Sequence, residues 1–149
     1  MKNKDFVPYT EALELKKLGF DEPCLAKYTV IPEDKINWFT IPEQGITDKT
    51  SFGSSKNYNS KFFEEEGIIS APTFSQAFRF FREKYGIKHI IFAGKISTVF
   101  YGYDLLHIEE QEFVVNNSDN GGGDCDYTTY EEAELACLVA LIKIVKDKT

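Results

Sequence analysis

The chain has 149 residues and a formal net charge of −7, with 42% hydrophobic and 28% charged residues. This length and composition predict one soluble globular domain spanning residues 1–149. The acidic balance argues against a general nucleic-acid binder, which neutralises phosphates with Lys and Arg. It leaves open a protein that presents carboxylates to a basic partner. The aromatic fraction of 15% predicts a large aromatic core or, less commonly, a recognition surface.

The cysteines and the apolar segments indicate an intracellular protein. Cys24, Cys125 and Cys137 are odd in number and form no CxxC, so we predict reduced thiols without a disulfide or bound zinc. Met1 to Asp5 lead into no apolar segment of a signal peptide, and no apolar run reaches membrane-spanning length. We therefore expect a cytoplasmic protein that does not enter a membrane.

The first half of the chain predicts a helix followed by a hairpin. Residues 8–18 show modest helical periodicity and end before a glycine. Residues 24–30 and 36–41, rich in β-branched and aromatic side chains, predict the two strands of the hairpin. Residues 42–60 are dense in Gly, Ser, Asn and Thr and predict a long flexible loop. Residues 68–69 are expected to lead directly into the next helix.

The strongest local signal predicts a helix over residues 73–85. Thr73 and Gln76 stand in the spacing of a capping box, and Gly86 follows the last turn. An apolar stripe recurs at helical period along Ala77, Phe78, Phe81 and Tyr85. Phe80 lies off this stripe, so its burial would mean that the helix is covered on two sides.

The second half predicts another hairpin. Residues 88–93 and 97–106 read as its strands, joined by a turn at Gly94 and Lys95. Gly102 in mid-strand indicates a bulge or the close approach of another backbone. Residues 108–115 predict a third strand.

Residues 116–126 contain three consecutive glycines and predict a second flexible loop. The carboxylates of Asp119, Asp124 and Asp126 miss the ligand register of an EF-hand, and two of them would repel an anion at the following helix. A solvated loop is therefore favoured over a calcium or phosphate site.

Residues 130–146 predict a final helix that begins at one of two overlapping capping boxes, Thr128 with Glu131 or Thr129 with Glu132. This helix is apolar nearly all round, which indicates burial on more than one side. It is expected at the centre of the core or in a dimer interface, and burial within the monomer is favoured.

The predicted fold class is α+β, with an antiparallel sheet built from hairpins and two to three helices packed on it. The element order is α-ββ-α-ββ(β)-α. The first two helices are each followed by a hairpin, a weak echo of an αββ repeat that shared capping chemistry explains nearly as well.

No residue pattern identifies a chemistry. His89 and His107, the only histidines, have no metal-ligand spacing, and no nucleophile elbow occurs. We therefore predict no catalytic residue, metal or cofactor. The candidate binding residues form an aromatic face with a cationic rim, namely Trp38, Tyr101, Tyr103, Arg79 and Arg82. The favoured alternative is that these strand residues face the core, with the tyrosines at its edge.

Three parts of the chain resemble a family of small proteins encoded by bacteriophages and prophages of gut Bacteroidales. They are residues 5–9 with 15–24, residues 71–86, which read APTFSQAFRFFREKYG, and residues 130–138, which read YEEAELACL. The family has no assigned activity and no catalytic motif. The resemblance therefore implies a phage accessory protein that acts inside a bacterium, without implying a mechanism.

The resulting hypothesis is a non-enzymatic accessory protein that acts by protein–protein interaction in the host cytoplasm. Its partner is an unknown host or phage protein, and a homodimer through the last helix or a sheet edge is left open. The alternative is a small-ligand binder that sequesters a nucleotide signal of host defence. An enzyme is a third reading, for which no local motif argues.

Overall fold

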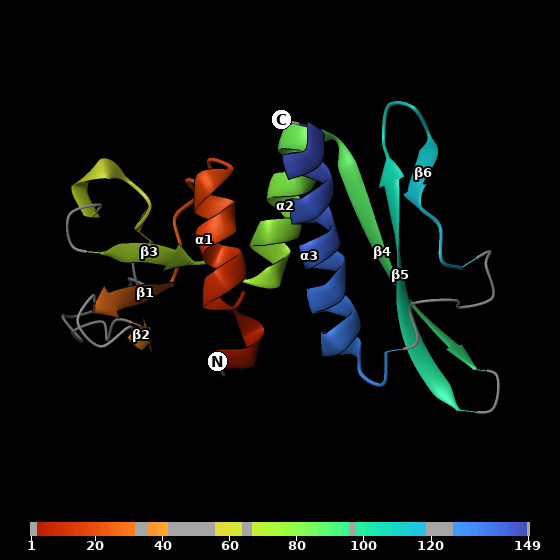
Figure 1. Ribbon diagram of the computed structural model, residues 1–149, viewed down its shortest axis with the longest axis horizontal. Helices are drawn as coiled ribbons and strands as arrows, with labels where there is room; N and C mark the ends of the chain where they lie inside the picture. Colours follow the sequence, from red (N-terminus) through yellow and green to blue (C-terminus); the bar gives the residue numbers. More distant parts are fainter. Residues whose placement is uncertain are drawn as a thin grey trace, which may run out of the picture. The chain divides into compact units, whose positions relative to one another are not determined.

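A computed structural model describes residues 3–31, 36–41, 56–63, 67–95, 98–118 and 127–148. The chain divides into two compact units, Met1–Gln76 and Ala77–Thr149, and the boundary falls within helix α2 (Phe74–Tyr85). Each unit holds one three-stranded antiparallel sheet (Figure 1). The α+β class and the antiparallel pairing are confirmed, but the strands form two sheets instead of one. The single domain over residues 1–149 stays a prediction.

The first unit consists of a helix and a small sheet with short 3-10 turns. Its elements are η1 (Asn3–Asp5), α1 (Tyr9–Lys17), β1 (Ala26–Ile31), β2 (Ile36–Thr40), η2 (Lys61–Phe63) and β3 (Ile68–Ala71). Strand β1 lies between β2 and β3, so the predicted hairpin of β1 and β2 is confirmed. Of the predicted loop over residues 42–60, the part up to residue 55 lies outside the described residues.

Strand β3 corrects the expectation that residues 68–69 lead directly into a helix. Its register runs from Ala26 opposite Ala71 to Thr29 opposite Ile68. All four β3 residues are buried. A strand buried on both faces has no polar and apolar alternation, and alternation is the signal by which a short strand is recognised in a sequence.

Helix α1 ends as predicted at Gly19, which adopts a φ of 88°. The Gly19 N–H donates to Lys16 O, and the Phe20 N–H donates to Leu15 O. This pair of bonds is a Schellman motif, which a residue in the left-handed region makes possible. The motif turns Phe20 back over Leu15, and both side chains are fully buried.

Helix α2 begins at the predicted capping box. The Gln76 N–H donates to Thr73 Oγ1 at 3.3 Å, and the Thr73 N–H donates to Gln76 Oε1 at 3.1 Å. Phe78 and Phe81 are buried, and Phe80, which lies off the predicted stripe, is buried as well. Helix α2 is therefore covered over a wider arc than one stripe.

The second unit contains the rest of α2, a sheet and a long helix. Its elements are β4 (Ile87–Lys95), β5 (Val99–His107), β6 (Glu112–Val115) and α3 (Tyr130–Lys148). The predicted turn at Gly94 and Lys95 is wrong, because both residues belong to β4 and pair with Phe100 and Val99. The sequence misleads here because glycine is the usual turn residue. Gly94 instead lies within a strand, where its lack of a side chain leaves room for the ring of Phe100.

The predicted third strand is shorter than expected. Residues 108–111 form a turn, and β6 begins only at Glu112. Gln111 closes that turn with a φ of 54°. The strand order is β4-β5-β6 in this sheet and β2-β1-β3 in the other, so the echo of an αββ repeat does not extend to a shared topology.

Helix α3 begins at the second of the two predicted capping boxes. The Glu132 N–H donates to Thr129 Oγ1 at 3.2 Å, and the Thr129 N–H donates to a Glu132 carboxylate oxygen at 3.3 Å. Its buried residues are Ala133, Cys137, Leu138, Leu141, Ile142 and Val145. At 100° per residue they cover about half of the helix circumference, while Val139 is 46% exposed. The apolar surface of α3 is thus largely buried within the chain. No described helix combines the length and apolarity needed to cross a membrane.

Candidate functional site

The five residues predicted to form a recognition face belong to different parts of the structure. Trp38 lies in β2 of the first unit, and its side chain is outside the described part of the chain. Arg79 and Arg82 are exposed on α2, and Tyr101 and Tyr103 lie two residues apart on β5, both half-buried. The structure therefore brings the two tyrosines onto one face of β5. The role of these five residues in binding stays a prediction.

The tyrosines of β5 meet two further tyrosines at the start of α3. Tyr101 packs edge-on against Tyr130, with ring centroids 6.3 Å apart, and Tyr103 stacks on Tyr127 at 6.4 Å. The backbones of Tyr101 and Tyr127 also exchange hydrogen bonds of 2.8 and 3.0 Å. These contacts attach the beginning of α3 to the sheet.

Cys24 in the first unit is a buried thiol of low reactivity. Burial, as the largest cause, raises the pKa of Cys24 to about 12, and neighbouring Ser70 lowers it only in part. A thiol with such a pKa is protonated at neutral pH and is a poor nucleophile. Both histidines of the chain belong to the second unit, so a cysteine–histidine pair within the first unit is excluded. Cys125 lies outside the described residues.

The two histidines belong to the sheet of the second unit, and only His89 is tightly packed. His89 stacks flat on Phe78 of α2, with ring centroids 3.7 Å apart and planes 12° apart. Burial, and then the positive charges of Arg82 and Lys88, lower the pKa of His89 to about 4. His107 Nδ1 lies 3.9 Å from a carboxylate oxygen of Glu110. Within the described ranges, no group of three or more His, Cys, Asp and Glu side chains is placed to hold a metal ion.

The sheet of the second unit has one face that its own helices cover. Phe78 of α2 stacks on His89 of β4, and α3 packs along β5 and β4. Ile87 and Leu105, which share the face of His89, are buried. Since side chains alternate along a strand, the even-numbered residues of β4 and β5 point to the opposite face.

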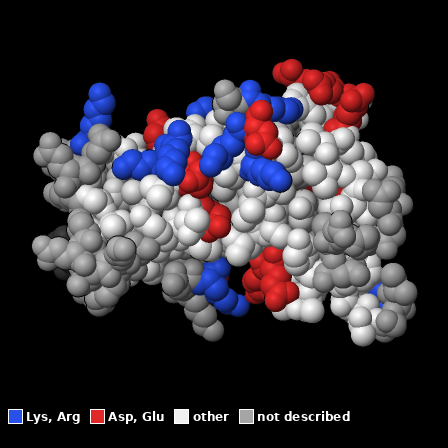
Figure 2. All heavy atoms as spheres, viewed as in Figure 1, with Lys and Arg blue, Asp and Glu red and all other residues white. Residues whose placement is uncertain are grey.

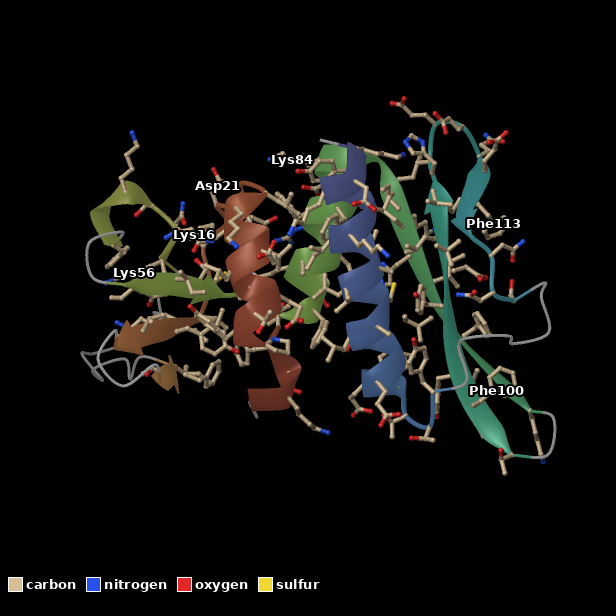
Figure 3. All side chains as sticks on the ribbon, viewed as in Figure 1. Lys16, Asp21, Lys56, Lys84, Phe100 and Phe113 are labelled. Carbon is tan, nitrogen blue, oxygen red and sulfur yellow. The ribbon has the colours of Figure 1, made fainter. Side chains whose placement is uncertain are left out.

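This opposite face is apolar where solvent-facing strands are normally polar. We define it as the outer face; its apolar residues are Ile90, Phe92, Phe100, Leu106 and Phe113, and the exposed Lys88 beside Leu106 is its one cation among the described residues. Ile90 is 39% exposed and Phe113 is 49% exposed. Figure 3 shows Phe100 and Phe113 on the side of β5 and β6 that points away from α3. Antiparallel sheets with one solvated face usually alternate apolar and polar residues, so this face has the composition of a covered surface.

Two phenylalanine rings make the outer face broad and shallow. Phe92 of β4 is paired with Gly102 of β5, and Phe100 of β5 is paired with Gly94 of β4. A Cβ atom added to either glycine would collide with the ring of its partner. Each ring therefore lies across the neighbouring strand, an arrangement that stabilises glycine in a sheet. The predicted close approach at Gly102 is real, but an aromatic ring approaches instead of a backbone.

Asp104 forms a closed polar border on this face. Its Oδ1 accepts hydrogen bonds from the backbone N–H groups of Asn117 and Ser118, at 2.7 and 3.0 Å. The Asn117 side chain donates to Tyr103 O at 2.7 Å. Asp104 is 4% exposed, and its carboxylate is engaged in these hydrogen bonds. It therefore holds the segment after β6 in place and does not serve as a free acid.

The turn between β5 and β6 carries a group of carboxylates beside the outer face. We call Glu109 and Glu110 of this turn, together with Glu112 at the start of β6, the acidic turn; all three are exposed. Figure 2 shows these carboxylates together at the upper right, where Figure 1 places the turn. Ile108 is 42% exposed and extends the apolar surface to the same turn.

The charge imbalance continues along the chain on both sides of the acidic turn. No Lys or Arg occurs between Lys95 and Lys143. The acidic residues of this stretch are Asp104, Glu109, Glu110, Glu112, Asp119, Asp124, Asp126, Glu131, Glu132 and Glu134. Strands β5 and β6 and the first turns of α3 are thus formed from a segment that contains only negative charges.

Sequence reasoning did not single out the outer face. Phe100 is recognisable from the sequence as lying opposite Tyr101 and Tyr103, and Phe113 as an apolar strand residue. What the sequence does not show is which of the two faces the helices cover. The only available signal is that both faces of β4 and β5 read as apolar, which occurs when a second layer covers them.

Comparisons of this chain with protein families, with curated proteins and with solved structures find no match. The phage resemblance therefore rests on the three sequence segments that carry it.

Proposed function

We propose that this protein is a non-enzymatic accessory protein that binds another protein through the outer face of its β4-β5-β6 sheet. The observation that carries the proposal is the row of apolar side chains on a sheet face that no helix in the described part of its unit covers. Exposed apolar patches of this kind mark interaction sites in soluble proteins. The aromatic content of the face adds support, because buried aromatic side chains contribute most to binding at interfaces.

Two further observations support a binding role over catalysis. Burial keeps the Cys24 thiol protonated, and stacking on Phe78 holds the ring of His89. Neither group is therefore a poised nucleophile or base. The phage resemblance supplies the setting of the proposal, which is the cytoplasm of a bacterial host.

The proposal predicts that a charge at Phe113 abolishes partner capture. We expect the wild-type chain, used as bait in host lysate, to retain a defined protein that Phe113→Asp loses, because an aspartate within an apolar interface stays desolvated and unpaired. Val139→Asp is the matched control, since Val139 is an equally exposed apolar residue on α3. Mass spectrometry of the three eluates is the measurement. Identical eluates from Phe113→Asp and the wild-type chain would refute the proposal.

A further inference from the structure

The shape of the outer face restricts what can cover it. A strand of nine residues is about 30 Å long, and three strands place their outer axes about 10 Å apart, so the face measures at most about 300 Å². A stable dimer interface needs about 800 Å² from each partner. An α-helix of about 20 residues is 30 Å long and about 10 Å wide. The face is thus too small for a stable sheet-on-sheet dimer and has the dimensions of one helix.

The surface of the face favours a helix as well. The rings of Phe92 and Phe100 lie across their neighbouring strands and leave a shallow apolar platform. Helices pack on sheets through an apolar stripe of this width. A helix on the outer face would complete a three-layer arrangement, because α2 and α3 already cover the other face.

The charges near the outer face determine which charge a bound partner should carry. The acidic turn lies at one end of the platform. The described outer face carries one cation at the same end, the exposed Lys88 of β4, which pairs with Leu106, so three carboxylates stand against one lysine. A second copy of this chain would bring the same three carboxylates and only its own Lys88, so negative charge would face negative charge. Interfaces are arranged so that opposite potentials meet, because contact between like charges disfavours binding.

We infer that the outer face binds a basic amphipathic helix of a partner protein, with its apolar stripe on Ile90, Phe92, Phe100 and Phe113 and its Lys or Arg residues at the acidic turn. This inference rests on the proposed function and names the chemistry of the partner. The partner helix carries apolar residues at i, i+3, i+4 and i+7, as in other helix-recognition interfaces.

The test uses the full chain and a displayed library of 20-residue peptides. Each peptide has a fixed Leu and Ala stripe at helical spacing, and its remaining positions are drawn from Lys, Glu and Gln. Peptides that bind the wild-type chain and fail to bind Phe113→Asp are sequenced. We expect Lys-rich peptides to be enriched at least about tenfold over Glu-rich peptides, and their binding to weaken as salt is raised.

A triple variant separates the charge contribution from the apolar one. Glu109→Gln, Glu110→Gln and Glu112→Gln together should weaken the enriched Lys-rich peptides by about tenfold, since three exposed ion pairs contribute roughly 0.2–1 kcal/mol each. Val139→Asp should bind them as the wild-type chain does. Ile90→Asp provides a second disruption of the face if Phe113→Asp fails to fold by circular dichroism.

The outcomes distinguish this inference from the proposed function. Enrichment of Glu-rich or uncharged peptides would overturn the inference that the partner presents a basic helix. The absence of any Phe113-dependent enrichment would overturn it as well. A dimer that Phe113→Asp dissociates in sedimentation equilibrium overturns it in favour of a second copy. If lysate capture still depends on Phe113 in these cases, the proposed function stands and only the partner chemistry is wrong.

Discussion

At the scale of single residues, His89 couples the stability of the second unit to pH. Its pKa is lowered to about 4 by burial and by nearby positive charge, whereas an unfolded histidine titrates near 6.5. Between these values the unfolded chain binds a proton that the folded chain does not. The free energy of unfolding therefore falls as pH decreases from about 6.5 to about 4, and no further loss from His89 occurs below that window.

We predict an NMR titration midpoint near pH 4 for the His89 ring. His89→Phe should keep the stack on Phe78 and remove this part of the pH dependence. Subtracting the two stability curves isolates His89 from the carboxylates, which titrate in the same range; Glu134, for example, has its pKa raised by burial. A midpoint near 6.5 would show that the stacked, buried ring does not describe the protein in solution.

At the scale of elements, α2 is fixed at its start by a cap and along its length by aromatic packing. Gln76 also donates to Pro23 O at 2.9 Å, so the capping residue ties the helix to the segment before β1. Phe80 packs edge-on against Phe81 and Tyr85, with centroids 5.5 and 5.7 Å away. A residue that lies off the predicted stripe is thus part of the core.

We predict that Phe78→Ala, Phe80→Ala and Phe81→Ala each lower the free energy of unfolding by about 3–5 kcal/mol, because each removes a buried ring and leaves a cavity. Urea denaturation followed by circular dichroism measures the three losses. Ser75→Ala, at an exposed position of the same helix, should change stability by less than about 0.5 kcal/mol. A loss at Phe80 of less than about 1 kcal/mol would restore the single-stripe description of α2.

At the scale of the whole molecule, one helix belongs to both compact units. The capping box of α2 lies in Met1–Gln76, and its buried phenylalanines from Phe78 onward lie in Ala77–Thr149. Unfolding of either unit would remove one end of α2. Since helices shorter than about 12–15 residues are marginal in water on their own, we expect the chain to unfold as one cooperative domain.

Two probes test this expectation. Trp38 is the only tryptophan and reports on the first unit by fluorescence, and the His89 resonance reports on the second. The urea midpoints of the two signals should coincide, as two-state behaviour requires. Midpoints separated by more than the experimental error would show two domains and contradict the single-domain prediction.

The amino-acid sequence by itself determined the local features of this protein. The cap at Thr73 and the glycine that ends α1 were predicted, and the cap at Thr129 was one of two predicted for α3, because a cap depends on side chains within a few residues of one another. The hairpin of β1 and β2 followed from the β-branched and aromatic composition of two neighbouring segments. The predicted aromatic face combined Trp38 with Tyr101 and Tyr103, which belong to separate strands. Rules that act over a few residues do not predict whether side chains of separate strands lie together.

Only the tertiary structure decided the features that depend on distant neighbours. Strand β3 was missed because burial on both faces removes the alternation by which strands are read. Gly94 was predicted in a turn, although its place in β4 depends on the ring of Phe100 across the sheet. The outer face became visible only when α2 and α3 were seen on the other side. The reason is physical: an apolar residue has the same character whether it is covered or exposed, and only packing determines which of the two occurs.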